Sequence, residues 1–390
     1  MPLALISLLM IPLVVGCGGD GEKSESSGDG SGDGSGDGGS GGGGDSSDGG
    51  TGGSSAPECA EAAPCTGEYV INNGDDLEEI SLCDSISGNL VLEDTTWLNA
   101  LELPCLGQAG GLEIGHIESL EISALETIDF AVLTTIGAGG LRLSNTGVST
   151  LVGFQQLQTV GGRLSISGND ALTSLNGLES LQSASGLSIG NNGGLTSLAG
   201  LENLEAVNGT IDIGGNSALA TLEGLDSLES IGDEIYISDN PVLASIAPLS
   251  VATSPEVIHL YIYDNASLSS LDGLQGIAAI QHLDISNNSN LTSLSGIEHI
   301  DSIQRISLVG NDSLTSLDDL SQLTEIRGGL DVANNSSLTS LEGLNGLENF
   351  GGWLEISGND SLCQTAVDDF VAFIQSISTA EVGAYGNSDC

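Results

Sequence analysis

Eight side chains suited to molecular recognition fall between positions 234 and 305, most of them 23 or 25 residues apart. They are Glu234, Tyr236, His259, Tyr261, Tyr263, His282, Asp284 and Arg305. The set holds three of the chain's five tyrosines and two of its four histidines. Because tyrosine and arginine carry much of the binding energy at interfaces, the set indicates a recognition surface, provided the fold brings residues two dozen apart together. The alternative is that Tyr and His serve here only as good outward strand residues.

The same residues raise the question of a metal or a catalytic centre. His259, His282 and the nearby carboxylates are of types that bind zinc, but no sequence-local ligand motif supports a site, and we predict none. His116 and His299 stand alone and are assigned structural or solvated roles. Weak association of calcium with the acidic surface fits the composition, although no EF-hand or Gly-Asp nonapeptide repeat is present. We therefore expect no cofactor.

Motifs of known enzyme classes are missing from the sequence. It contains no nucleophile elbow, no phosphate loop and no HExxH. We therefore expect that the protein is not an enzyme. The least favoured alternative is a β-helix that cleaves polysaccharides, with acidic side chains and Arg305 as candidates.

The elements that must position the recognition residues belong to a long repeat marked by asparagine. Ten asparagines follow one another at 23 to 25 residues: Asn145, Asn169, Asn192, Asn216, Asn240, Asn265, Asn288, Asn311, Asn335 and Asn359. A period of this size is typical of a solenoid, in which coils stack on one another. With one strand per coil, the predicted fold is a mainly β, parallel β-helix or leucine-rich solenoid of about ten to twelve coils over residues 57–390.

The coil around Asn169, RLSISGNDALTSLNGLESLQSA, shows how each repeat is built. Leu164 and Ile166 alternate with polar residues, which predicts a short strand. Leucines then follow at every third position from Leu172 to Leu181, which fits 3₁₀-like steps better than an α-helix. We expect each Asn to be buried at a corner, where its amide satisfies backbone N–H and C=O groups and the amides form a ladder. A ligand-binding row of amides is the alternative.

In this register, outward side chains at equivalent positions of successive strands line up, and we call each such row across the sheet a column. Two columns are of interest. One column is Arg142, Ser165, Ser188, Asp212, Tyr236, Tyr261, Asp284, Ser307, Asp331 and Glu355. The other is Arg163, Gly186, Thr210, Glu234, His259, His282, Arg305, Gly329 and Trp353. The recognition residues gather on four neighbouring coils. Beside them, Pro241, Pro248 and Pro255 fall in the longest Asn interval, and such an irregular loop favours recognition.

Both ends of the array are predicted to be capped by helices. Val367, Phe370, Val371 and Ile374 follow helical spacing, and a short helix near the N-terminal end would turn Leu77 and Ile80 inward. Because covered ends keep strand edges from pairing with other chains, we expect a monomer.

Six cysteines flank the array: Cys59, Cys65, Cys83, Cys105, Cys363 and Cys390. In an exported chain an even set indicates three disulfides. Cys83 and Cys105 each lie seven residues before a predicted strand, which makes them equivalent positions on coils about 4.8 Å apart. We therefore pair Cys83 with Cys105, Cys363 with Cys390, and Cys59 with Cys65.

The first 56 residues differ from the array. Residues 1–17 form an apolar run that ends in VVGC and resembles the signal peptide and lipobox of bacterial lipoproteins, which implies a lipidated Cys17. Residues 18–56 are almost only Gly, Ser and Asp, which predicts a disordered tether. We expect an exported protein, anchored by lipid to the bacterial outer membrane and exposed at the surface, with Gly18 favouring that membrane. An ordinary cleaved signal is the alternative.

The charge of the chain is strongly negative, with 54 acidic and 5 basic residues and a formal net charge of −49. Nucleic acid is excluded as a partner, since phosphate contacts need Lys and Arg. Cations and basic partners are favoured, and solubility alone is the plain alternative.

The repeats resemble receptor L domains, known from insulin- and growth-factor-receptor ectodomains. DDLEEISLCDSISGNLVLED is similar to the opening of that family, and GGRLSISGNDALTSLNGLESL to its internal coils. The resemblance covers roughly residues 68–390, about twice a single L domain, so the array is one extended domain or two fused ones. It implies a right-handed β-helix and binding at the cell surface. The expected function is a lipid-anchored scaffold that recognises a protein or glycan through the outward face of its sheet. A passive surface-coat protein is the alternative.

Overall fold

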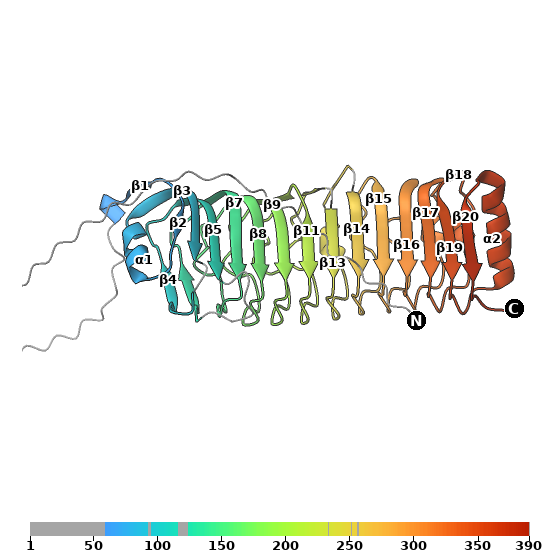
Figure 1. The fold of residues 1–390 in the computed structure, drawn as a ribbon, viewed down its shortest axis with the longest axis horizontal. Helices are drawn as coiled ribbons and strands as arrows, with labels where there is room; N and C mark the ends of the chain where they lie inside the picture. Colours follow the sequence, from blue (N-terminus) through green and yellow to red (C-terminus); the bar gives the residue numbers. More distant parts are fainter. Residues whose placement is uncertain are drawn as a thin grey trace, which may run out of the picture. The chain divides into compact units, whose positions relative to one another are not determined.

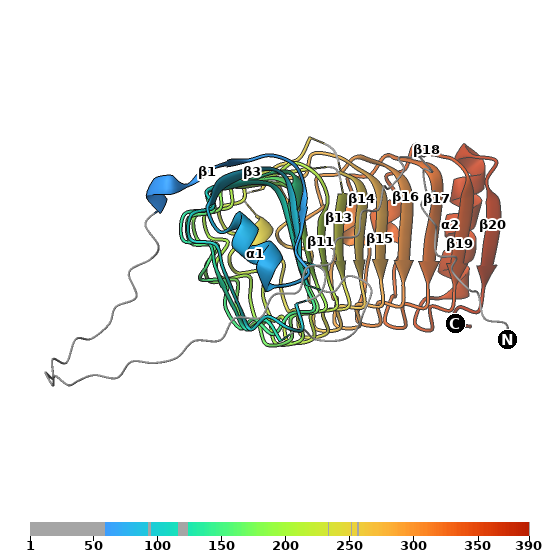
Figure 2. The ribbon, with the colours of Figure 1, turned by 60° about the vertical axis from the view of Figure 1, so that its left-hand side comes forward.

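The computed structural model describes residues 59–92, 95–115, 124–232, 234–250, 252–255 and 257–389. They belong to one compact unit that spans 55–390. Figure 1 shows its strands side by side, and Figure 2 shows the coils one behind another. The fold is a parallel β-solenoid of about 13 turns, which confirms the predicted fold class. The predicted signal with Cys17, the tether 18–56, His116 and Cys390 lie outside the described residues.

The elements follow one another along the chain with short connections. The N-terminal ones are η1 (Cys59–Glu61), β1 (Ala63–Cys65), β2 (Tyr69–Val70), α1 (Gly74–Ile80), β3 (Cys83–Leu92), β4 (Ala100–Glu102), β5 (Gln108–Gly115) and β6 (Thr127–Asp129). The middle ones are β7 (Thr135–Ser144), β8 (Thr159–Ser167), β9 (Ser183–Gly190), β10 (Ala206–Val207), β11 (Ile211–Gly214), β12 (Ser230–Ile231), β13 (Glu234–Ser238), η2 (Ala247–Leu249), β14 (Val257–Tyr263) and β15 (Ile280–Ser286). The C-terminal ones are β16 (Ser302–Val309), η3 (Asp318–Leu320), β17 (Glu325–Ala333), η4 (Glu342–Leu344), β18 (Asn349–Phe350), β19 (Trp353–Ser357), α2 (Gln364–Ile377) and β20 (Glu381–Tyr385).

One long sheet runs through the described residues. It holds 18 strands, while β4 and β6 form a separate parallel pair. The stack is slightly longer than the ten to twelve coils expected, since β1 and β2 before β3, and β20 after β19, add strands at the two ends. These end strands lack the leucine and asparagine pattern by which the coils were counted.

The leucines spaced by three form the wall of the core opposite the sheet. Leu172, Leu175, Leu178 and Leu181 are fully buried. The Leu178 N–H donates to the Leu175 carbonyl at 3.1 Å, and the Leu181 N–H donates to the Leu178 carbonyl at 2.9 Å. These bonds between residues three apart confirm the predicted 3₁₀-like steps. Each step points one leucine inward, so that the coils share one continuous apolar core.

The asparagine ladder is present, and its amides are buried, as expected for a structural role. From Asn169 to Asn359 the repeat asparagines are 0% exposed. Asn265 is representative: its Nδ2 donates to the carbonyls of Ile237 (2.8 Å) and Tyr263 (3.0 Å), and its Oδ1 accepts from the Asn240 N–H (3.2 Å). Each amide thus satisfies backbone groups on two coils. Because the amides from Asn169 to Asn359 do not reach solvent, the alternative of a ligand-binding amide row is wrong.

The assignment of Asn145 to the ladder is also wrong. Thr146 takes that place, and its N–H and hydroxyl donate to Asn169 Oδ1 at 2.9 and 2.6 Å. Asn145 is the residue before the ladder position, where the backbone turns with φ of +53°. Gly, Asn or Asp fills this left-handed corner in the following coils, because few other residues tolerate it. At the other end the ladder gains Asn387, whose Oδ1 accepts from the Asn359 N–H at 3.2 Å.

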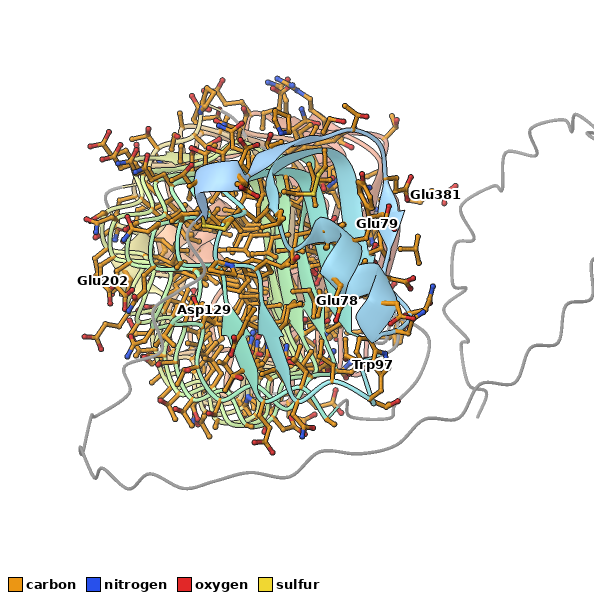
Figure 3. All side chains as sticks on the ribbon, turned by 90° about the vertical axis from the view of Figure 1, so that its left-hand side faces the viewer. Glu78, Glu79, Trp97, Asp129, Glu202 and Glu381 are labelled. Carbon is orange, nitrogen blue, oxygen red and sulfur yellow. A yellow bond between two sulfur atoms is a disulfide. The ribbon has the colours of Figure 1, made fainter. Side chains whose placement is uncertain are left out.

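Both predicted capping helices are confirmed. In α1, Ile80 is buried and Leu77 packs against the core, and the Asn73 side chain caps the helix by accepting from two N–H groups. Figure 3 looks onto this end, where Glu78 and Glu79 of α1 are exposed. In α2, Val367, Phe370 and Ile374 are buried, and Val371 is half-buried. Neither described helix is long and apolar enough to cross a bilayer.

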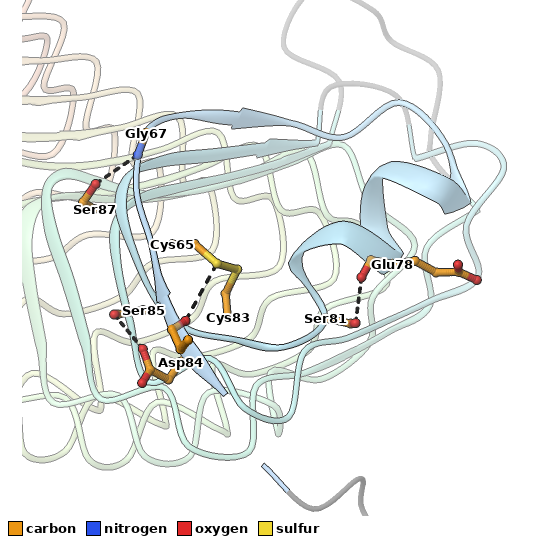
Figure 4. Close-up of a disulfide and its surroundings, with 9 residues drawn as sticks. Cys65, Gly67, Glu78, Ser81, Cys83, Asp84, Ser85 and Ser87 are labelled. Atoms are coloured by element: carbon orange, nitrogen blue, oxygen red, sulfur yellow. Dashed lines mark hydrogen bonds between the residues drawn. A yellow bond between two sulfur atoms is a disulfide. The ribbon is translucent and has the colours of Figure 1, made fainter. Parts of the chain in front are cut away.

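The disulfides correct the predicted pairing at the N-terminal end. Cys59 is bonded to Cys105, and Cys65 to Cys83, the bridge drawn in Figure 4. The predicted pairs Cys83–Cys105 and Cys59–Cys65 are therefore wrong. The reason is that β1 lies beside β3, with Ala63 opposite Cys83, while β3 begins at Cys83 itself rather than seven residues later. Cys363 is disulfide-bonded, and its predicted partner lies outside the described residues.

Candidate functional site

The parallel register brings the recognition residues into adjacent columns, as predicted. Tyr236 on β13 pairs with Tyr261 on β14, which pairs with Asp284 on β15. The column beside it runs in the order Glu234, His259, His282 and Arg305. Tyr263 lies in a third column, between Ser238 and Ser286.

Alternation along the strands turns these side chains outward. On β14, Leu260 and Ile262 are buried in the core, and His259, Tyr261 and Tyr263 are half-buried on the opposite side. The strand places its apolar residues at a period of two, and the core takes that face. The polar and aromatic residues therefore share the other face of the sheet.

Four rings contact one another on three consecutive strands, and we call Tyr236, His259, Tyr261 and His282 the aromatic patch. The Tyr236 and Tyr261 rings stack with centroids 4.9 Å apart. The His259 ring lies 5.6 Å from Tyr261 and 5.0 Å from His282. Stacked and edge-on pairs at these distances are attractive. Each ring therefore restricts its neighbours, and the patch is ordered before any ligand arrives.

A carboxylate fixes one end of the patch. Glu234 Oε1 lies 3.0 Å from His259 Nδ1, and Glu234 Oε2 accepts from the Thr210 hydroxyl at 3.1 Å. The hydrogen bond with His259 is the main cause that lowers the pKa of Glu234, and Thr210 adds to it against partial burial. Glu234 is therefore ionised at neutral pH and orients the imidazole ring.

The tyrosines of the patch keep their protons. Burial raises the pKa of Tyr236 to about 12, with a further contribution from the Glu234 charge. Burial, followed by the charge of Asp284, also raises the pKa of Tyr261. Both hydroxyls therefore remain hydrogen-bond donors at neutral and moderately alkaline pH.

The other end of the surface is formed by Arg305 with a residue that the sequence prediction missed. The Arg305 guanidinium lies 5.4 Å from the centre of the Trp353 ring, a cation–π contact. Gly329 stands between them in the column, and a Cβ there would lie 2.7 Å from the indole. The glycine thus lets the indole lie across its strand. A glycine between an arginine and a tryptophan in one column was the available signal.

Asp331, in the column next to Trp353, was not predicted either. Burial raises its pKa to about 6, and the charge of Glu355 on the next strand adds to this. Among the described residues its Oδ1 is buried without a hydrogen-bond partner. The carboxyl group is therefore held in an environment that favours the protonated form.

The histidines do not converge on a common point. His259 Nδ1 contacts Glu234, whereas His282 Nε2 contacts Gln304 Oε1 at 3.1 Å. His299, which was set aside as isolated, contacts the Ile277 carbonyl through Nε2. Within the described ranges, no group of three or more His, Cys, Asp or Glu side chains is arranged to hold a metal ion.

The fold and the surface together define a parallel β-solenoid with an aromatic and charged strip across its sheet. No known family model matches the sequence, and no curated protein is similar to it.

Proposed function

We propose that this chain is a lipid-anchored binding protein of the bacterial cell surface, similar to receptor L domains, that recognises a protein or a glycan through its sheet. The aromatic patch is the proposed contact site. The observation that carries the proposal is the mutual packing of its four rings on β13, β14 and β15. Rigid aromatic side chains lose little conformational entropy on binding, so a smaller ordering cost opposes the free energy of their contacts.

The surroundings of the patch support a specific rather than a passive role. Charged groups of both signs flank the rings, with Glu234 on β13 at one side and Asp284 on β15 and Arg305 on β16, with its indole partner, at the other. Rings surrounded by polar groups that fix orientation are typical of recognition surfaces. A passive coat needs no such order.

The test is capture of ligands by the full-length chain on a glycan and protein array. Tyr261→Ser should weaken capture about tenfold, because it removes the ring at the centre of the stack. Its melting temperature should stay close to that of the unchanged chain, since the ring is half-buried and outside the core. Tyr385→Ser is the matched control, a tyrosine on β20 of the same sheet that is 62% exposed.

Each outcome separates the alternatives. Capture that is equal for Tyr261→Ser and the unchanged chain removes the patch from the proposal. An array with no ligand at all favours the surface-coat protein, and release of reducing sugars from the glycans favours the enzyme. The anchor is tested separately, because Cys17→Ala should move the chain from the membrane fraction to the soluble one.

A further inference from the structure

The outward face of the sheet is hollowed on the N-terminal side of the aromatic patch. Two adjoining hollows, of about 330 and 520 Å³, share Arg142, Ser165 and Ser188 in their lining. They form one open groove from β3 to β13. Its floor is low because three of the outward positions of β9 and β11 are small residues, Ser188, Gly190 and Gly214, with Asp212 as the larger one.

The positive charges of the chain are concentrated on this sheet. Only 5 of the 390 residues are basic, and the four arginines lie on β7, β8, β16 and β17. Arg142 and Arg163 stand on the adjacent strands β7 and β8, and both line the first hollow. In a chain of net charge −49, two neighbouring arginines create a local site for an anion.

Both arginines are available to a ligand. Arg142 has a long contact of 3.4 Å with Glu113, and its side chain is 48% exposed. Arg163 forms no salt bridge with any residue that the structure describes. Its side chain lies over the next strand, as shown by the 3.4 Å that would separate the Arg163 Nε from a Cβ at Gly186. The side chain therefore extends towards β9, in the column beside Ser165 and Ser188.

The floor has the opposite hydrogen-bonding character. Ser188 donates to Asp212 Oδ2 at 3.3 Å, and the outward Ser165 lies opposite Ser188. A carboxylate accepts hydrogen bonds and cannot donate them. The groove thus combines a pair of arginines that fits a carboxylate in bidentate geometry with a floor that fits hydroxyl donors.

We propose that this groove binds an oligosaccharide that contains uronic acid. The sugar carboxylate lies between Arg142 and Arg163, and the hydroxyls lie over Ser188 and Asp212. From β8 to β11 is two coil steps, or about 10 Å, which suits a short stretch of sugar rings. The site uses none of the four patch residues, so it does not depend on the function proposed for them.

An acidic peptide fits the groove less well. The strands beneath it are paired on both sides, so no backbone edge is free for an added peptide strand. Further carboxylates of such a peptide would also meet Asp212 without hydroxyl donors to offer it.

The experiment is calorimetric titration of the full-length chain with a trimer of galacturonic acid and, in parallel, with a neutral trimer of galactose. The acidic trimer should bind at least tenfold more tightly, and binding should weaken as salt is raised. Arg163→Gln and Arg142→Gln should each weaken it about tenfold. Ser188→Leu should also weaken it by filling the floor while leaving both charges in place. Arg327→Gln is the matched control, since it removes the same charge from an exposed arginine that is paired with Glu325.

Several results would overturn the proposal. They are equal binding of the two trimers, no effect of Arg163→Gln, or an equal loss with Arg327→Gln. A tetraglutamate peptide that binds as tightly as the acidic sugar would reassign the groove to acidic peptides. Failure of Tyr261→Ser to alter array capture would refute the function of the aromatic patch and leave this site intact.

Discussion

Replacing Asn265 with alanine would remove a central member of the buried asparagine ladder. Five hydrogen bonds would be lost. Three come from its Nδ2, to the carbonyls of Ile237 and Tyr263 and to Asn288 Oδ1, and two reach its Oδ1, from the N–H and the Nδ2 of Asn240. Three of these partners keep another bond, and one is Asn288 Oδ1, which still accepts from the backbone N–H of residue 265 at 3.1 Å. The Tyr263 carbonyl still accepts from the Asp239 N–H at 3.1 Å, and Asn240 Nδ2 still donates to Ile213 at 2.9 Å.

The Asn240 N–H and one lone pair of the Ile237 carbonyl would then be left unsatisfied in the core. A buried polar group without a partner costs about 1–3 kcal/mol. We therefore expect Asn265→Ala to lower the free energy of unfolding by about 2–6 kcal/mol. Asn290→Ala, at an exposed turn residue of the following coil, should change it by less than about 0.5 kcal/mol.

The assay is urea unfolding followed by circular dichroism, with hydrogen exchange to locate the opening, because a solenoid can unfold locally. Exchange should accelerate first in β13 and β14, the strands that carry the tyrosines of the patch. A loss below about 1 kcal/mol, or a loss equal to that of the control, would refute the view that the amides support the register of the coils.

Two further predictions concern charge and covalent links. The pKa of Asp331 is about 6 in the folded chain against an ordinary 3.8. Between these two pH values the folded state holds a proton that the unfolded chain has released. The free energy of unfolding therefore falls as pH rises through that window. After allowance for the solvent exposure of this carboxyl, the free energy of unfolding of the unchanged chain should fall by about 1 kcal/mol more than that of Asp331→Asn between pH 4 and pH 7. Identical urea midpoints of the two chains at every pH would contradict this. Peptide mapping without reductant should recover the links Cys59–Cys105 and Cys65–Cys83, and recovery of a peptide joining Cys83 to Cys105 would show that the N-terminal strand does not pair as described.

The period predicted the register because coils of nearly equal length place residues 23 to 25 apart side by side. Tyr236, Tyr261 and Asp284 are aligned for that reason alone. The same rule failed where the repeat is irregular. It placed Asn145 in the ladder, because spacing does not distinguish the corner residue from the one that follows, and it missed Asn387, which lies beyond the helix α2.

The spacing of the repeats does not predict the direction in which the side chains of a column point. Arg305 contacts Trp353 two strands away because the glycine between them leaves space. The groove depends likewise on a row of small residues together with the two arginines that line its first hollow.

The sequence by itself determined the stack of coils, the buried leucines and the strands that carry the aromatic patch, since apolar spacing decides which residues leave water. Tertiary structure alone decided the disulfide pairs, the raised pKa of Asp331 and the groove beside Arg163. These depend on distances between side chains of different coils and on the space that neighbours leave, and no spacing along one chain encodes them.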